Sequence, residues 1–223
     1  MTHRDDSSGR PAGGLPRAFV PANEHEQILV AVAEVVSVVG YDAMTLEDVA
    51  AHIGIDAETV RGHFPDNESA FLAAYEAAVW QGVDRILKAI AEPRGFSARI
   101  WAASEAFIEF NVSEPAFASM CIVDVLAVGQ AGIERRNTTL RGFAAVIEQI
   151  ADESLPADRP RPPELYLSIV LGGITEIFRG HLAEGRIAQL PEALPSMHYT
   201  LVVPYIGHQA ALEEYERRER SAR

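Results

Sequence analysis

The sequence predicts an all-α protein of about nine helices. Apolar residues recur at helical spacing along most of the chain, and clusters of glycine and proline interrupt that spacing. No stretch bounded by turn residues alternates strictly between apolar and polar residues, as a half-buried strand would. With 223 residues, of which 48% are apolar and 23% charged, the chain has the composition of an ordinary globular protein.

The chain is expected to begin with a flexible arm over residues 1–23, followed by the first helix. From Glu24 the apolar residues recur at helical spacing, and Gly40 follows where a left-handed residue would end the helix. The stripe consists of Ile28, Leu29, Val32, Val35, Val36 and Val39. This spacing predicts an amphipathic helix over 24–39.

Two short helices are expected next, joined by a turn that contains a glycine. Thr45 opens the first, because an acid follows it three residues later as in a capping box, and Gly54 ends it. Asp56 is placed to cap the second, over 57–64. A long helix followed by two short helices is the helix-turn-helix pattern, in which the second short helix enters the major groove of DNA. The motif spans 45–64.

A fourth helix is expected over 67–91, long enough to leave one compact unit and enter another. Further helices follow between breaks at 93–95, 113–115, 129–132, 155–163 and 189–195. The last two helices are expected near 164–183 and 196–217, and their apolar stripes suit a four-helix dimer interface or packing within one chain.

The charge of the chain argues against a nucleic-acid partner. The formal net charge is −13, so the surface as a whole repels a polyanion. Between Glu24 and Ala74 there are ten acids and a single base, Arg61, which gives this segment a charge of −9. Several of these acids lie at expected helix N-termini, where they cap backbone N–H groups. Any DNA binding is therefore expected to be weak and sensitive to salt.

Several classes of protein are not expected. The single cysteine, Cys121, excludes an internal disulfide and a zinc site built from several thiolates. The sequence contains no nucleophile motif, no paired metal ligands and no phosphate-binding glycine loop, so we expect no catalytic residues, no metal and no cofactor. No apolar run reaches the ~20 residues that span a bilayer, and the first residues lack the core of a signal peptide. We expect a cytoplasmic protein with no membrane contact.

The segment from Glu24 to Tyr75 resembles the tetracycline-repressor (TetR) family of bacterial transcriptional regulators. The matching positions are Ile28 to Tyr41, Thr45 to Ala50, Gly54 to Val60 and His63-Phe64, with Glu68, Phe71 and Leu72. The resemblance implies a homodimeric repressor that leaves double-stranded operator DNA when a small effector binds. It also implies a DNA-binding domain over 24–75 and an effector-binding and dimerisation domain over 76–223.

The resemblance places the DNA contacts on the helix-turn-helix and at the start of the helix that follows it. The candidates are Thr45, Ala57, Glu58, Thr59, Arg61, Gly62, His63 and Asn67. Family members usually carry an aromatic residue at the position of Arg61 and a lysine at that of Asn67. Arg61 can itself contact phosphate or guanine, whereas Asn67 keeps a donor without the charge. The alternative is a dimer of the same architecture that binds a ligand or protein and has weakened or lost DNA binding.

The resemblance also implies an effector pocket and a dimer interface in the second domain. The pocket candidates are Trp101, Phe107, Phe110, Met120, Cys121, Asp124, Phe143, Tyr166 and Phe178. They predict an apolar or aromatic effector, although each one taken alone also suits a core position. Asp124 lies in an apolar run and needs a partner, either an arginine or a ligand. The interface candidates are Leu171, Ile174, Tyr199, Val202, Val203 and Ile206.

Overall fold

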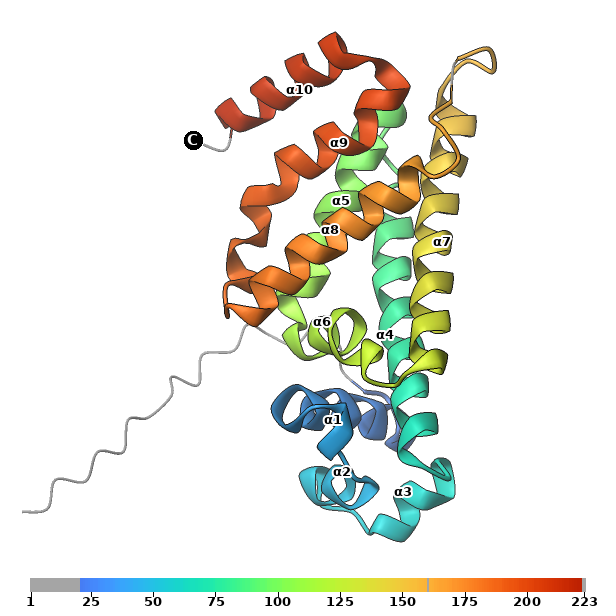
Figure 1. Cartoon of the computed structure of the whole chain (residues 1–223), viewed down its shortest axis with the longest axis vertical. Coiled ribbons are helices and arrows are strands. Elements are labelled where there is room, and N and C mark those ends of the chain that lie inside the picture. Colours follow the sequence, from blue (N-terminus) through green and yellow to red (C-terminus); the bar gives the residue numbers. More distant parts are fainter. Residues whose placement is uncertain (1–20, 160, 222–223) are drawn as a thin grey trace, which may run out of the picture.

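The computed structural model describes residues 21–159 and 161–221, and in these residues it is all-α. Its helices are α1 (Glu24–Val39), α2 (Leu46–Ile53), α3 (Ala57–His63), α4 (Asn67–Ala89), α5 (Phe96–Ser113), α6 (Pro115–Ile122), α7 (Gln130–Ser154), α8 (Tyr166–Ala183), α9 (Leu194–Ile206) and α10 (His208–Ser221). Figure 1 shows α1, α2 and α3 as a lower unit, with α4 rising from it into an upper bundle. The expected arm over 1–23 lies outside the described residues except for 21–23.

The capping residues of the helix-turn-helix lie where the sequence predicts them. The Thr45 hydroxyl accepts the backbone N–H of Asp48 at 3.1 Å, and the Asp48 carboxylate accepts that of Thr45 at 3.1 Å. Gly54 ends α2 with φ 72°, a left-handed conformation that favours glycine. Asp56 caps α3, and Asp66 caps α4. The turn that sets the angle between α2 and α3 is therefore encoded locally.

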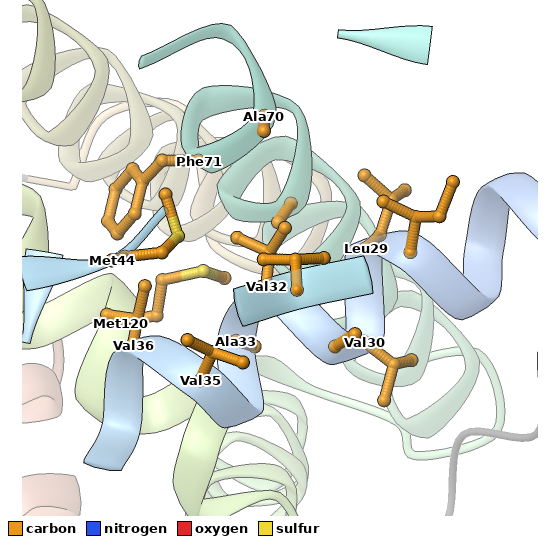
Figure 2. Packing of buried hydrophobic residues seen from close by; sticks show 14 of the residues in the cluster. Leu29, Val30, Val32, Ala33, Val35, Val36, Met44, Ala70, Phe71 and Met120 are labelled. Carbon is orange, nitrogen blue, oxygen red and sulfur yellow. The ribbon is translucent and has the colours of Figure 1, made fainter. Parts of the chain in front are cut away.

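Helix α1 is surrounded by other helices, so it is not the amphipathic helix that the sequence predicted. It packs against α2, α4 and α6, so Val30, Ala31 and Ala33 are buried together with the predicted stripe. Figure 2 shows its side chains pointing in several directions into the core. Val39, which the sequence assigned to the buried stripe, is 48% exposed because it lies in the last turn of the helix.

The chain also differs from expectation near its C-terminus. The segment 196–217, expected as one helix, is divided by Gly207, whose φ is 86°, into α9 and α10. Helix α10 then folds back against α9, which brings the described helices to ten. The break expected at 189–195 largely coincides with a 3-10 helix over Ile187–Ala193.

Two apolar cores are present, and α4 contributes to both of them. Its first half places Phe71 and Ala74 in the lower core, while Ile86 belongs to the upper core between α5, α7, α8 and α9.

Within the described ranges no single helix is long and apolar enough to cross a bilayer. Helix α5 and the segment 115–126 reach the required length and hydropathy only together, and the angle between them is 106°.

Candidate functional site

Helix α3 presents one face to solvent and packs with the other against the core. Its residue Val60 is buried, and so is Phe64, directly after the helix. Glu58, Arg61, Gly62 and His63 are exposed, and Ala57 and Thr59 are half-buried. The candidates on α3 therefore lie where a second helix of a helix-turn-helix would meet DNA.

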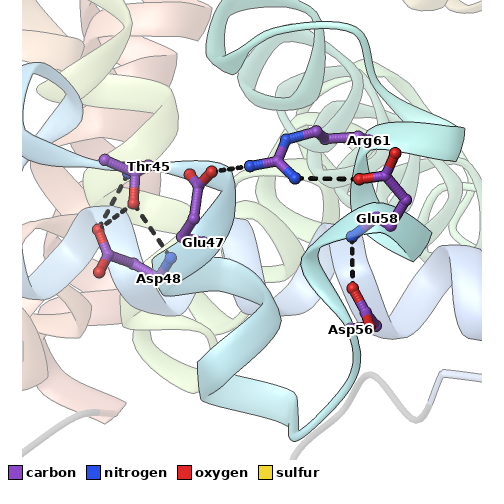
Figure 3. Close-up of polar contacts among 6 residues, drawn as sticks. All are labelled: Thr45, Glu47, Asp48, Asp56, Glu58 and Arg61. Carbon is purple, nitrogen blue, oxygen red and sulfur yellow. Dashed lines mark hydrogen bonds and ion pairs between the residues drawn. The ribbon is translucent and has the colours of Figure 1, made fainter.

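Arg61 is engaged by two carboxylates. Its guanidinium forms an ion pair with Glu47 on α2 and another, at 3.2 Å, with Glu58 one turn earlier on α3 (Figure 3). The charge of Glu47 is the main cause that raises the pKa of Arg61 further above its already high value. A phosphate or a guanine would have to share the guanidinium with these carboxylates or replace one of them. The only base between residues 24 and 74 is thus held at the expected DNA face by acids.

Two other candidates also hold internal contacts. The Thr45 hydroxyl caps α2 and donates to the Asp48 carboxylate at 2.6 Å. The Asn67 amide donates to the backbone carbonyl of Met44 at 2.7 Å, which ties the start of α4 to the loop before α2. These contacts show that Thr45 and Asn67 fix the shape of the motif.

The acids of the lower unit have several structural roles. Asp48, Asp56 and Asp66 cap helices, and Glu34 lies 2.7 Å from the ring Nε2 of His52. Caps of this kind neutralise part of the carboxylate charge against the helix dipole. They do not provide a cation for a phosphate, so the face around α3 keeps its negative character.

The upper bundle forms a cavity of about 130 Å³ between α4, α5, α6, α7, α8 and α9. Its walls are largely apolar. Five of the nine pocket candidates line it, namely Phe107, Phe110, Cys121, Phe143 and Phe178. The Phe107 ring packs against those of Phe143 and Phe178, with centroids 5.6 and 5.1 Å apart. Burial raises the pKa of Cys121 to about 12, so its thiol stays protonated.

The other four candidates lie away from this cavity. Met120 is buried in the lower core, and the Tyr166 hydroxyl donates to the backbone carbonyl of Thr200 at 2.7 Å. Asp124 accepts from the Ser119 hydroxyl at 2.9 Å, so its partner is a hydroxyl and not the arginine considered above. Burial raises the pKa of Asp124.

Trp101 faces a different part of the bundle. Its ring packs on His198, at 5.3 Å between centroids, and the guanidinium of Arg218 lies 3.8 Å above it. This cation–π contact joins α5 to α10. Trp101 therefore stabilises the end of the bundle and does not line the cavity.

Several lining residues were missing from the candidates. Tyr75 and Gly82 come from α4, and Arg136, Thr139 and Leu140 come from α7. The helical spacing of 136, 139, 140 and 143 would have indicated a common face of α7. The pocket candidates were mostly aromatic, and Phe143 was the one candidate on α7.

The interface candidates divide into buried and partly accessible residues. Val202 and Ile174 are buried in the core of the same chain, and Leu171 lines the cavity, so these three do not form an outer surface. Val203 and Ile206 are half-buried. The Tyr199 hydroxyl lies 2.8 Å from the Nδ1 atom of His208 on α10. Helix α10, which the sequence did not separate, covers part of this face of α9.

The outer face of α8 carries an apolar row that the sequence candidates did not include. Leu165, Ile169 and Ile177 are 67%, 71% and 45% exposed, and the exposed Gly173 continues their spacing of four residues. Residues four apart lie on one side of a helix.

Among the described residues no group of three or more histidine, cysteine, aspartate or glutamate side chains is arranged to hold a metal ion.

Comparison with known proteins supports the fold. No protein-family model matches the sequence, and no curated protein sequence matches it significantly. Among solved structures, the chain is similar to the fatty acid degradation regulator FadR from Bacillus halodurans, with a TM-score of 0.72 at 14% identity over 82% of this chain and 97% of that one.

Two further solved structures are similar to this chain in fold. A TetR-like regulator from Rhodococcus sp. RHA1 gives a TM-score of 0.66 at 17% identity, over 83% of this chain and 97% of that one. FadR from Bacillus subtilis, solved with stearoyl-CoA, gives 0.61 at 14% identity, over 82% and 99%. The described residues therefore have the fold of TetR-family transcriptional regulators, as the resemblance of the helix-turn-helix implied.

Proposed function

We propose that this chain, folded as TetR-family regulators are, is a cytoplasmic homodimer that binds operator DNA through α3 and is released from it by a small effector. The observation that carries the proposal is the placement of α4. This one helix begins directly after the helix-turn-helix and continues as a wall of the interior cavity. A change in the cavity can therefore move the DNA-reading unit.

Tyr75 is the clearest contact along this route. Its ring is buried in the lower core and also lines the cavity. Its hydroxyl donates to that of Thr139 on α7 at 2.9 Å. A ligand that separates α4 from α7 would break this bond and tilt α4. Such a ligand controls DNA binding only if it binds the tilted arrangement more tightly.

The cavity favours an apolar effector. A volume of about 130 Å³ is close to that of cavities that hold a benzene ring. The similar FadR from Bacillus subtilis was solved with stearoyl-CoA, so the fold accommodates a long acyl chain. A chain of that length would require this cavity to expand, which is the kind of movement that would displace α4.

The exposed row on α8 supports a dimer. Leu165, Ile169 and Ile177 form an unusually apolar outer face, and Gly173 lets a second helix approach closely. A two-fold dimer through α8 whose axis runs along the long direction of the chain would place both copies of α3 at one end of the assembly (Figure 1). Binding to successive major grooves then requires the two helices to be ~34 Å apart.

The test is selection of DNA from a random library with the full chain, followed by fluorescence anisotropy on the enriched sequence at low salt. We expect one palindromic site and loss of about tenfold or more in affinity for Arg61→Ala. Arg141→Ala, an exposed arginine on α7, is the matched control and should leave affinity unchanged. Failure to enrich any sequence, with no complex at micromolar protein, would overturn the proposal.

A second function remains supported by one observation. Because Arg61 is held by Glu47 and Glu58, the same architecture also suits a ligand-binding or protein-binding dimer that has lost DNA binding. That function predicts ligand binding and dimerisation without any enriched DNA sequence. The selection experiment therefore distinguishes the two.

A further inference from the structure

We propose that the effector is an amphipathic anion, whose apolar tail fills the cavity and whose carboxylate or similar acidic group binds Arg136. This inference rests on the proposed function, because it takes the cavity to be the effector site. It adds the chemical class of the ligand and the residue that recognises its charge.

The first argument comes from the polar side chains in the cavity wall. Ser104, Asn111, Thr139 and Thr175 each donate to the backbone carbonyl four residues earlier, at 2.7 to 3.1 Å. Bonds of this kind satisfy a side chain within its own helix. These donors are therefore occupied before any ligand arrives.

Arg136 is different. It lines the cavity, and its Nε atom is buried with no hydrogen-bond partner among the described residues. The neighbouring carboxylates are engaged elsewhere: Glu76 pairs with Arg135, and Glu176 accepts two bonds from Arg179, at 2.8 and 2.5 Å. A buried donor on a charged group is costly to leave unpaired. The charge of Arg136 does act on Glu176, but within the described part of the chain no group accepts a hydrogen bond from its buried Nε atom.

These features define the ligand. The apolar walls favour a hydrocarbon or aromatic tail, and the planar guanidinium of Arg136 suits an anion that accepts two hydrogen bonds. A neutral ligand of the same shape would leave the charge of the guanidinium uncompensated, and a cation would be repelled. The position of Arg136 on α7, one turn before the Thr139 hydroxyl that accepts from Tyr75, places the anion beside the contact between α4 and α7.

The experiment is calorimetric titration of the full chain at pH 7.5 with octanoate, 1-octanol and octylammonium, which share a tail and differ in head group. We expect octanoate to bind at least tenfold more tightly than 1-octanol, and octylammonium to bind most weakly. Arg136→Gln should reduce octanoate to the affinity of 1-octanol without changing that of 1-octanol. Arg136→Lys should keep part of the preference.

Arg135→Gln is the control, because this adjacent arginine is exposed and pairs with Glu76 outside the cavity. It should retain the full preference for octanoate, and the thermal melt of each variant should show that it is folded. Equal binding of octanoate and 1-octanol to the unmodified chain, or a preference that persists in Arg136→Gln, would overturn the inference and leave the cavity as an effector site. If no member of the series from hexanoate to hexadecanoate binds, the inference fails, whereas the effector part of the proposed function fails only if 1-octanol does not bind either, and the DNA selection would be unaffected.

Discussion

Replacing Glu47 with glutamine is expected to strengthen DNA binding. In the free protein the Glu47 carboxylate pairs with the Arg61 guanidinium on the neighbouring helix of the motif. A phosphate must compete with that carboxylate, and it is also repelled by it. Glu47→Gln keeps the shape of the side chain and its position in the first turn of α2, but it removes both effects. The guanidinium donors that Glu47 holds would then be free to contact the DNA backbone, in addition to the base contact proposed for Arg61 in the unmodified chain.

The size of the effect follows from counterion release. Each phosphate contact contributes about −0.9 to the slope of log K against log salt concentration on duplex DNA. One additional contact from each subunit of a dimer would steepen the slope by about 1.8. Over a fourfold range of salt, from about 50 to 200 mM, this corresponds to about a tenfold larger loss of affinity. At low salt the variant should bind more tightly than the unmodified chain.

The measurement is fluorescence anisotropy on the selected DNA across this range of salt. Glu184→Gln is the control, because Glu184 is also exposed and paired with an arginine, Arg186, but lies at the end of α8. The Glu47→Gln, Arg61→Ala double variant should lose the gain. An unchanged slope, or a gain that survives in the double variant, would show that Glu47 does not compete for Arg61.

Three further results are expected. Asn67→Ala should lower the free energy of unfolding by about 1–2 kcal/mol, seen as a lower urea midpoint, because the Met44 carbonyl loses its donor; an unchanged midpoint would contradict this role. Gly54→Ala should cost about 1–2 kcal/mol, since φ is 72° there, whereas Gly142→Ala within α7 should be neutral or stabilising. Burial lowers the pKa of His198 in the folded chain below the ordinary 6.5, so the unfolded chain protonates this side chain at a higher pH than the folded chain does. The free energy of unfolding should therefore fall as the pH drops below about 6.5. His198→Gln should reduce this pH dependence, and identical profiles of stability against pH for the two proteins would refute it.

Features that depend on neighbouring residues could be predicted from the sequence. The Thr45 capping box, the left-handed Gly54 and the Asp56 cap each involve residues within a few positions of one another. Their hydrogen bonds are set by local geometry, so a pattern of three or four letters is sufficient. The short helices of the motif follow from them directly. Asp66 begins α4 for the same reason.

Features that depend on packing between helices could not be predicted from the sequence. The partner of Arg61 lies fourteen residues away on another helix, and the charge count alone did not show that an acid would hold it. Tyr166 and Trp101 are on the correct helices but face away from the cavity, because both faces of those helices contact other elements. Gly207 interrupts an apolar stripe that would otherwise suit one continuous helix. The buried core of α1 likewise depends on α6, which is distant in sequence.

The packing of α6 against α1 limits how this protein could exchange parts with proteins of the same fold. Phe117 and Met120 from α6 complete the core around α1, although they lie far beyond the helix-turn-helix in the chain. A recombination point after residue 75 would separate them from the surface they cover and expose the apolar side of α1. A chimera that joins α1, α2 and α3 to another bundle would fold only if that bundle supplied an equivalent to α6. The unit that folds together is therefore larger than the helix-turn-helix itself.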